Sequence, residues 1–104
     1  MNILTLDTTN SKITKLSLQK GAERFDIARE YDKPQADKIL PEIEKLLKNN
    51  STKPEELDKI IVQRGPGSYT GIRVGLTIAN TLAFALKIPV NARKVGEYET
   101  ALYT

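Results

Sequence analysis

The chain has 104 residues and a mass of 11.6 kDa, which is the size of one domain. Apolar residues make up 39% and charged residues 28%, a balance typical of globular rather than disordered proteins. Cysteine and histidine are absent, which excludes disulfides, thiolate or imidazole metal sites and acid–base catalysis by histidine. No apolar run could span a bilayer and Met1 leads directly into a strand-like run. We therefore expect a cytoplasmic protein with no membrane partner.

The charges are unevenly distributed along the chain. The net charge of +3 is weak support for nucleic-acid binding, but eleven of the thirteen acids lie at or before Asp58. Residues 59–96 contain no acid at all. The simpler interpretation is that this half holds the buried elements, and the alternative is that it faces an anion or an acidic partner.

The first half of the chain predicts three strands and a helix. A short apolar run over residues 3–6 and two alternating segments at 13–19 and 23–31, with a turn at Gly21, are typical of a strand followed by a hairpin. After residue 34 the apolar period becomes helical and ends near residue 50. Pro41 lies inside this pattern, so we expect it to kink the helix or to mark its first turn.

The second half predicts a strand, a helix and a last strand. Residues 59–63 are continuously apolar at their centre, as in a central parallel strand, and residues 53–57 form a helical turn before them. A glycine-rich segment then opens a long apolar helix over 70–86, and residues 87–90 lead into a short strand. Residues 97–102 could begin a further helix.

The order β-β-β-α-β-α-β predicts an α/β domain with a mixed five-stranded sheet, the arrangement of ribonuclease-H-like and actin-like (ASKHA) proteins. We expect this domain to occupy residues 1–92 and a tail to occupy residues 93–104.

The acid that ends the first strand is the first candidate site. In ribonuclease-H-like and actin-like proteins an acid at the position of Asp7, beside Thr8, holds a metal or approaches nucleotide phosphates. The alternative is that Asp7 and Thr8 cap the turn that follows. A two-metal nuclease needs several converging acids, and the sequence contains no such cluster.

The glycine-rich segment is the second candidate site. It reads G-x-G-x-x-x-G between a strand and a helix, which departs from both the dinucleotide fingerprint and the Walker loop. Helix N-termini nevertheless attract anions, and arginines flank this one. The candidate anion contacts are Arg64, Gly65, Gly67, Ser68, Thr70 and Arg73. The alternative is a shaped turn whose glycines allow unusual dihedral angles and whose Thr70 caps the helix.

The helix over 70–86 is apolar around most of its circumference, so it must be covered on more than one side. Small residues recur every fourth position along it, which lets another helix approach closely. The candidate partner interface combines both helices: Leu40, Ile43, Leu47, Gly75, Ile78, Ala79, Leu82 and Ala83. The alternative is that the helix lies deep inside its own domain.

Four blocks of the chain, in this order and spacing, resemble the TsaB (YeaZ) family: MNILTLDTT at 1–9, KILP at 38–41, RGPGSYTGIRVG at 64–75 and LAFALKIPV at 82–90. The resemblance covers only the N-terminal domain of a family whose members commonly have a second one. It is interrupted at Gln35 and Ala36, where the family usually has His-Ser, and at residues 91–94, where it usually has small and serine residues.

The resemblance implies a non-catalytic subunit, without cofactor, of the bacterial machinery that adds a threonylcarbamoyl group to an adenosine of tRNA. It implies pairing through the two helices with a TsaD-like transferase, or with a second copy in its absence, and joining a TsaE-like ATPase through the complex. It implies only indirect contact with tRNA, and makes Asp7 and Thr8 a vestigial phosphate-loop position. Two other functions stay open: a small nucleotide-dependent enzyme, and an RNA-binding module that uses basic residues such as Lys59, Arg93 and Lys94.

Overall fold

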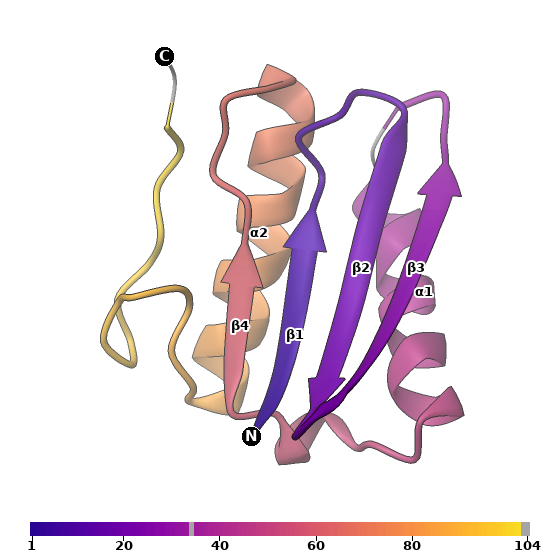
Figure 1. The fold of residues 1–104 in the computed structure, drawn as a ribbon. Coiled ribbons are helices and arrows are strands. Elements are labelled where there is room, and N and C mark those ends of the chain that lie inside the picture. Colours follow the sequence, from indigo (N-terminus) through magenta and orange to yellow (C-terminus); the bar gives the residue numbers. More distant parts are fainter. Residues whose placement is uncertain (34, 103–104) are drawn as a thin grey trace.

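The computed structural model describes residues 1–33 and 35–102. Its elements, in chain order, are β1 (Asn2–Asp7), β2 (Ile13–Lys20), β3 (Glu23–Glu30), α1 (Ala36–Asn49), a 3-10 turn η1 (Pro54–Glu56), β4 (Lys59–Val62) and α2 (Tyr69–Leu86) (Figure 1). The three strands and the helix predicted for the first half are confirmed, and Pro41 lies within α1.

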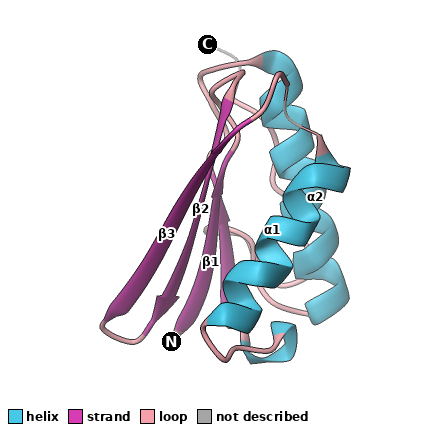
Figure 2. Cartoon of the chain, turned by 90° about the vertical axis from the view of Figure 1, so that its right-hand side faces the viewer, coloured by secondary structure: helices cyan, strands magenta, loops and turns pink. Residues whose placement is uncertain are grey.

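The described strands form one mixed sheet in the order β3-β2-β1-β4, with β1 antiparallel to β2 and parallel to β4. Both helices pack on the same face of this sheet, so the molecule has two layers (Figure 2). Alternate strand side chains point into the space between the layers, as the two-residue period of a strand requires. The buried strand residues are Leu4, Leu6, Leu16, Leu18, Ile60 and Val62.

The expectation of a fifth strand is wrong for the residues that the structure describes. Val90 makes only an isolated parallel bridge with Ile60. Asn91 then adopts a left-handed backbone conformation, with φ 52°, which turns the chain away from the sheet. Its side chain takes the next position along the ladder: Oδ1 accepts from the Val62 N–H at 2.8 Å, and Nδ2 donates to the Val62 carbonyl at 3.1 Å. An amide side chain therefore closes the edge of β4.

The described tail contains no helix, which corrects the expectation for residues 97–102. Residues 91–102 run as irregular chain along the outside of β4 (Figure 1). The last two residues of the predicted tail, Tyr103 and Thr104, lie outside the described part of the chain.

Candidate functional site

Asp7 and Thr8 make the contacts of a turn cap. The Asp7 Oδ1 accepts from the backbone N–H of Thr9 at 3.0 Å and from its hydroxyl at 2.6 Å. The buried Thr8 hydroxyl donates to the Gly71 carbonyl at 2.6 Å, which joins the end of β1 to the start of α2. Over residues 1–33 and 35–102, no three acidic side chains come close enough together to hold a metal ion.

The glycine-rich loop is packed against the chain on both sides. Ser68, not Thr70, is the N-cap of α2, because its hydroxyl accepts from the Gly71 N–H at 3.2 Å, while Thr70 lies exposed in the first turn. A Cβ at Gly67 would lie 2.5 Å from the Thr9 carbonyl oxygen, and a Cβ at Gly65 would overlap the carbonyl oxygen of Leu102. These close approaches explain why glycine is needed at both positions.

The two arginines that flank this loop point to partners within the chain and not to a shared anion site. Arg64 donates to the Thr100 carbonyl at 2.8 Å and pairs with Glu99 at 3.3 Å. Arg73 donates to the Tyr69 hydroxyl at 2.8 Å and lies over the ring of the same tyrosine. The anion that Arg64 binds is therefore part of the protein.

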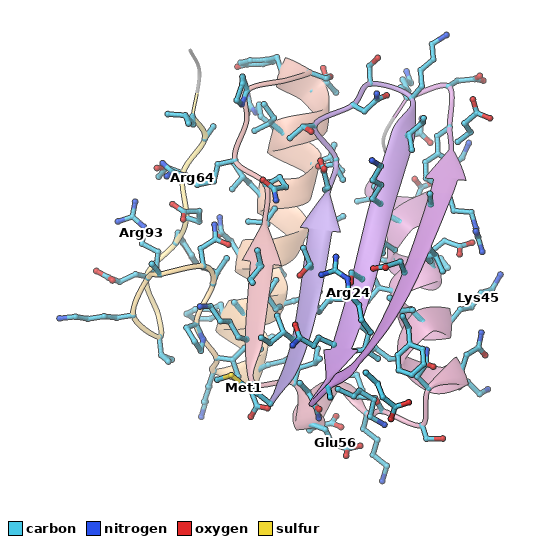
Figure 3. All side chains as sticks on the ribbon, in the orientation of Figure 1. Met1, Arg24, Lys45, Glu56, Arg64 and Arg93 are labelled. Atoms are coloured by element: carbon cyan, nitrogen blue, oxygen red, sulfur yellow. The ribbon has the colours of Figure 1, made fainter. Side chains whose placement is uncertain are left out.

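Glu99 is the residue whose role the sequence did not reveal: its carboxylate is the shared partner of Arg64 and Arg93. Its side chain is 5% exposed, and a single oxygen, Oε1, lies 3.3 Å from Arg64 and 3.2 Å from Arg93. The other oxygen accepts from the Asn91 amide at 2.9 Å. Arg64 and Arg93 lie on the same side of the molecule, beside the tail (Figure 3). The sequence feature that points to Glu99 is its position, since Glu97 and Glu99 are the first acids after a long basic stretch.

The surroundings of Glu99 act on its pKa in two directions. Burial raises the pKa, whereas hydrogen bonds from Asn91, the Thr100 N–H and Arg93, together with the charge of Arg64, lower it. Burial is the largest single effect, but the lowering effects together outweigh it, so the pKa lies below its ordinary value of 4.5. The backbone of Glu99 is also held, because Asn80 both donates to its carbonyl and accepts from its N–H.

The small-residue stripe of α2 is buried within the chain, which corrects its assignment to a partner interface. Ala79 is 0% exposed and Ala83 is 4% exposed. A Cβ at Gly75 would overlap the Thr8 hydroxyl, because α2 crosses the end of β1 at this point. Three further residues of the predicted interface are buried within the chain: Ile43, Leu47 and Ile78.

Leu40 and Leu82 remain accessible and lie together. They line a groove between α1 and α2 of about 450 Å³, in which Leu40 is 42% exposed and Leu82 and Leu86 are half-buried. Residues of β1, of α1 and of the segment after α1 complete the lining: Leu4, Asp37, Pro41, Ile43, Glu44, Leu47, Pro54 and Leu57. We call this the α1–α2 groove.

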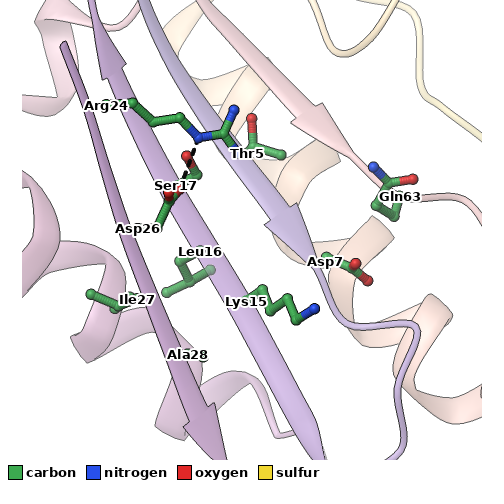
Figure 4. Close-up of a pocket in the computed structure, with 10 residues that line it drawn as sticks. All are labelled: Thr5, Asp7, Lys15, Leu16, Ser17, Arg24, Asp26, Ile27, Ala28 and Gln63. Carbon is green, nitrogen blue, oxygen red and sulfur yellow. Dashed lines mark hydrogen bonds and ion pairs between the residues drawn. The ribbon is translucent and has the colours of Figure 1, made fainter.

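A second hollow, of about 480 Å³, lies on the face of the sheet that the helices leave open (Figure 4). Its side chains are mostly polar, and Arg24 pairs at 2.9 Å with Asp26, two residues further along β3. A hydrogen bond from Ser17 and the neighbouring Arg24 lower the pKa of Asp26. Acidic and basic side chains both line this hollow, so its charge does not indicate one class of ligand.

Within the part of the chain that the structure describes, neither helix has the length and hydropathy needed to cross a membrane.

Comparisons with known proteins identify similar chains. The family model described as TsaD, tRNA N6-adenosine threonylcarbamoyltransferase, matches residues 29–92. A tRNA threonylcarbamoyladenosine biosynthesis protein TsaB from Bacillus subtilis (strain 168) is 37% identical over 100 residues, which are 96% of this chain and 43% of that protein. The TsaB protein of Haemophilus influenzae is 36% identical over 90 residues, which are 86% of this chain and 38% of that protein.

The solved structure of YeaZ from Pseudomonas aeruginosa superposes with a TM-score of 0.82 at 29% identity, and the match covers 89% of this chain and 43% of that one. The chain thus spans about two fifths of the length of the relatives that it matches.

Proposed function

Because the chain belongs to the TsaB (YeaZ) family of tRNA threonylcarbamoyladenosine biosynthesis proteins, we propose that it acts there as a non-catalytic subunit. In this proposal it binds and activates a TsaD-like transferase through the α1–α2 groove and forms a homodimer when that partner is absent. A TsaE-like ATPase joins through the complex, and tRNA is contacted only indirectly.

The observation that carries the proposal is the α1–α2 groove itself. It gathers half-buried or exposed leucines from two adjacent helices, and apolar area of this kind is stabilised when a partner removes it from water. By contrast, the residues that would serve nucleotide chemistry are engaged within the chain. Asp7 caps a turn, Arg64 binds Glu99 and Arg73 binds Tyr69.

The test is the mass and affinity of the complex with TsaD from the same organism, measured by light scattering and calorimetry. We expect a 1:1 complex that Leu40→Glu weakens by at least tenfold, because the leucine lies in the groove and a buried unpaired charge is costly. Charges at Ala79 or Ala83 would not test pairing, since both residues are buried within the chain and an unpaired charge there would destabilise the fold itself.

Phe84→Ser is the matched control. Phe84 is also an exposed apolar residue of a helix, at 61%, but it faces Tyr98 on the side of the tail and does not line the groove. Equal loss of affinity in both variants would contradict the groove as the contact surface. Titration with ATP and magnesium should give no stoichiometric binding, and a micromolar isotherm would favour the enzyme alternative.

A further inference from the structure

The two edges of the sheet are closed to different degrees. At β4, Val90 bridges to Ile60, and the Asn91 side chain binds the N–H and the carbonyl of Val62. The opposite edge is β3, which is 8 residues long (Figure 1). Among the described residues, no strand pairs with its outer side. An open edge of this length is a template for another strand.

Hydrogen bonds at the ends of the strands show which groups of β3 point outward. The Tyr31 N–H donates to the Lys12 carbonyl at 2.7 Å, directly beyond the paired residues Ile13 and Glu30. Hydrogen-bonded pairs alternate along an antiparallel ladder, so the odd-numbered residues of β3 bond to β2. The backbone groups of the even-numbered residues therefore face away from the sheet: Arg24, Asp26, Ala28 and Glu30.

These four outward residues also carry their side chains on the face of the sheet that the helices leave open. Arg24, Asp26 and Ala28 line the hollow on that face (Figure 4), and Glu30 shares it by the two-residue period of the strand. All four are exposed. Arg24 pairs with Asp26 at 2.9 Å, whereas no ion pair reaches Glu30 among the described residues. The charges along the edge are thus basic, acidic, neutral and acidic.

The Ala28 carbonyl is the outward group that a side chain already covers. Arg29 Nη1 donates to this carbonyl at 3.1 Å, while Arg29 Nε pairs with Glu42 of α1 at 3.2 Å. A carbonyl oxygen has two lone pairs, and Arg29 keeps its carboxylate partner if a strand is added. The side chain therefore narrows access to the edge without closing it.

A second copy of β3 fits this edge in one register. A two-fold axis perpendicular to the sheet sets two β3 strands antiparallel, with equivalent residues in contact. When the axis passes through Ile27, all four outward residues are paired. Arg24 then lies opposite Glu30 at both ends of the contact, and Asp26 lies opposite the uncharged Ala28. Moving the axis by one residue in either direction pairs fewer residues and sets Asp26 opposite another acid.

We propose that β3 is an edge at which two copies of this chain join their sheets, antiparallel and in register about Ile27. The outward N–H and carbonyl groups hold the strands together, and the pairs between Arg24 and Glu30 select the register. A contact of one strand per copy buries less surface than a stable interface of standard size. The dimer therefore forms at high protein concentration.

This edge is separate from the α1–α2 groove, since no residue of β3 lines the groove. The inference goes beyond the proposed function and adds a contact to it without replacing one. A 1:1 complex with TsaD, formed in dilute solution, is expected to join in pairs through β3 as the concentration rises. The β3 contact is measured alone in the Leu40→Glu chain, in which pairing through the groove is disabled.

Sedimentation equilibrium of the Leu40→Glu chain without TsaD is the first test, and we expect a weak dimer. Adding Arg24→Glu should weaken that dimer by about tenfold, because acids then face each other at both ends of the contact. The exchanged pair Arg24→Glu/Glu30→Arg should restore it. Lys94→Glu is the matched control, since it changes the net charge equally but lies in the tail beside β4. It should leave the dimer unchanged.

The backbone is tested separately from the charges. Ala28→Pro removes one outward N–H, and proline is tolerated at such a position of an edge strand, so the variant should fold and lose the dimer. Thermal melting checks the fold of each variant. In the Leu40→Glu chain itself, raising the protein concentration should slow amide exchange at Asp26 and Ala28. The amides of Phe25 and Ile27, which already bond to β2, should not change.

Three results would overturn the proposal. The first is a Leu40→Glu chain that remains monomeric at about 1 mM. The second is a dimer that Ala28→Pro abolishes but the exchanged pair does not restore, because β3 then pairs in another register or with another segment. The third is amide exchange at Asp26 and Ala28 that does not depend on concentration. None of these measurements uses TsaD, so a parent chain that fails to bind TsaD contradicts the proposed function alone.

Discussion

At the residue scale, one close fit in the molecule joins Gly75 of α2 to Thr8, which directly follows β1. The Thr8 hydroxyl occupies the space in which a Cβ on Gly75 would lie, and it is fixed there by its hydrogen bond to Gly71. We expect Gly75→Ala to lower the free energy of unfolding by about 1–3 kcal/mol through overpacking, although alanine has the higher helix propensity. Urea denaturation measures this change.

A double-mutant cycle provides the control for Gly75→Ala. In a Thr8→Ala background the obstructing hydroxyl is gone, so the same glycine substitution should cost clearly less. Gly67→Ala is the matched contrast, because the atom that its Cβ would meet is the backbone oxygen of Thr9, which no side-chain substitution removes. Equal costs of Gly75→Ala in the two backgrounds would show that Thr8 does not set the packing at this point.

At the element scale, the path of α2 shows what the sequence could and could not predict. Its limits were predicted to within one residue, but the expected covering on more than one side is incomplete within the chain, since Phe84 is 61% exposed. The direction of its small-residue stripe was not predictable, because a stripe of this kind suits close approach to a helix or to a sheet. The Thr8–Gly75 contact decides between them, and it joins residues that are far apart in the sequence.

The last strand was mispredicted for a related reason. The Lys-Ile-Pro-Val segment after α2 is apolar enough for a strand, and Val90 does reach the position expected beside Ile60. What ends the strand is the backbone of Asn91, whose side chain then substitutes for further strand pairing. Asparagine tolerates the left-handed conformation, but the sequence does not reveal that its amide will bind a neighbouring strand.

Asn91→Ala should therefore open the edge of β4. The substitution removes the partners of both the N–H and the carbonyl of Val62, and an unsatisfied buried polar group costs about 1–3 kcal/mol. We expect the Val62 amide to exchange with solvent faster than in the parent, as measured by hydrogen exchange with NMR detection.

Asn80→Ala is the matched control for the edge of β4. Asn80 also holds the tail through its side-chain amide, but it binds the backbone of Glu99 and does not contact Val62. It should loosen the tail and leave the exchange of the Val62 amide unchanged. If both variants accelerate that exchange equally, docking of the tail and not the Asn91 amide protects the edge.

At the scale of the whole molecule, a basic stretch of chain finds its counter-charge inside the same chain. The acid-free segment 59–96 was interpreted as either buried or facing an anion, and the structure contains both situations. Its strand and helix form much of the core, while Arg64 and Arg93 converge on Glu99. The Glu99 carboxylate thus links the loop between β4 and α2 to the segment that follows α2.

This arrangement makes the stability of the protein sensitive to acid. The pKa of Glu99 is lower in the folded chain than its ordinary value of 4.5. Folding is therefore more favourable when the Glu99 carboxyl is ionised than when it is protonated. Its contribution is complete above the ordinary pKa and is lost as the pH falls through 4.5 toward the lowered value. Glu99→Gln should remove this contribution and leave two arginines without their carboxylate, lowering the free energy of unfolding at neutral pH by about 1–2 kcal/mol.

Urea denaturation of both proteins from pH 7 to pH 3 measures the effect, with Glu97→Gln, an exposed neighbour, as the control. The curves of parent and Glu99→Gln should converge as the pH falls, because protonation abolishes in the parent the charge that the variant lacks. A constant gap across this range would mean that Glu99 acts through its shape and hydrogen bonds and not through its charge.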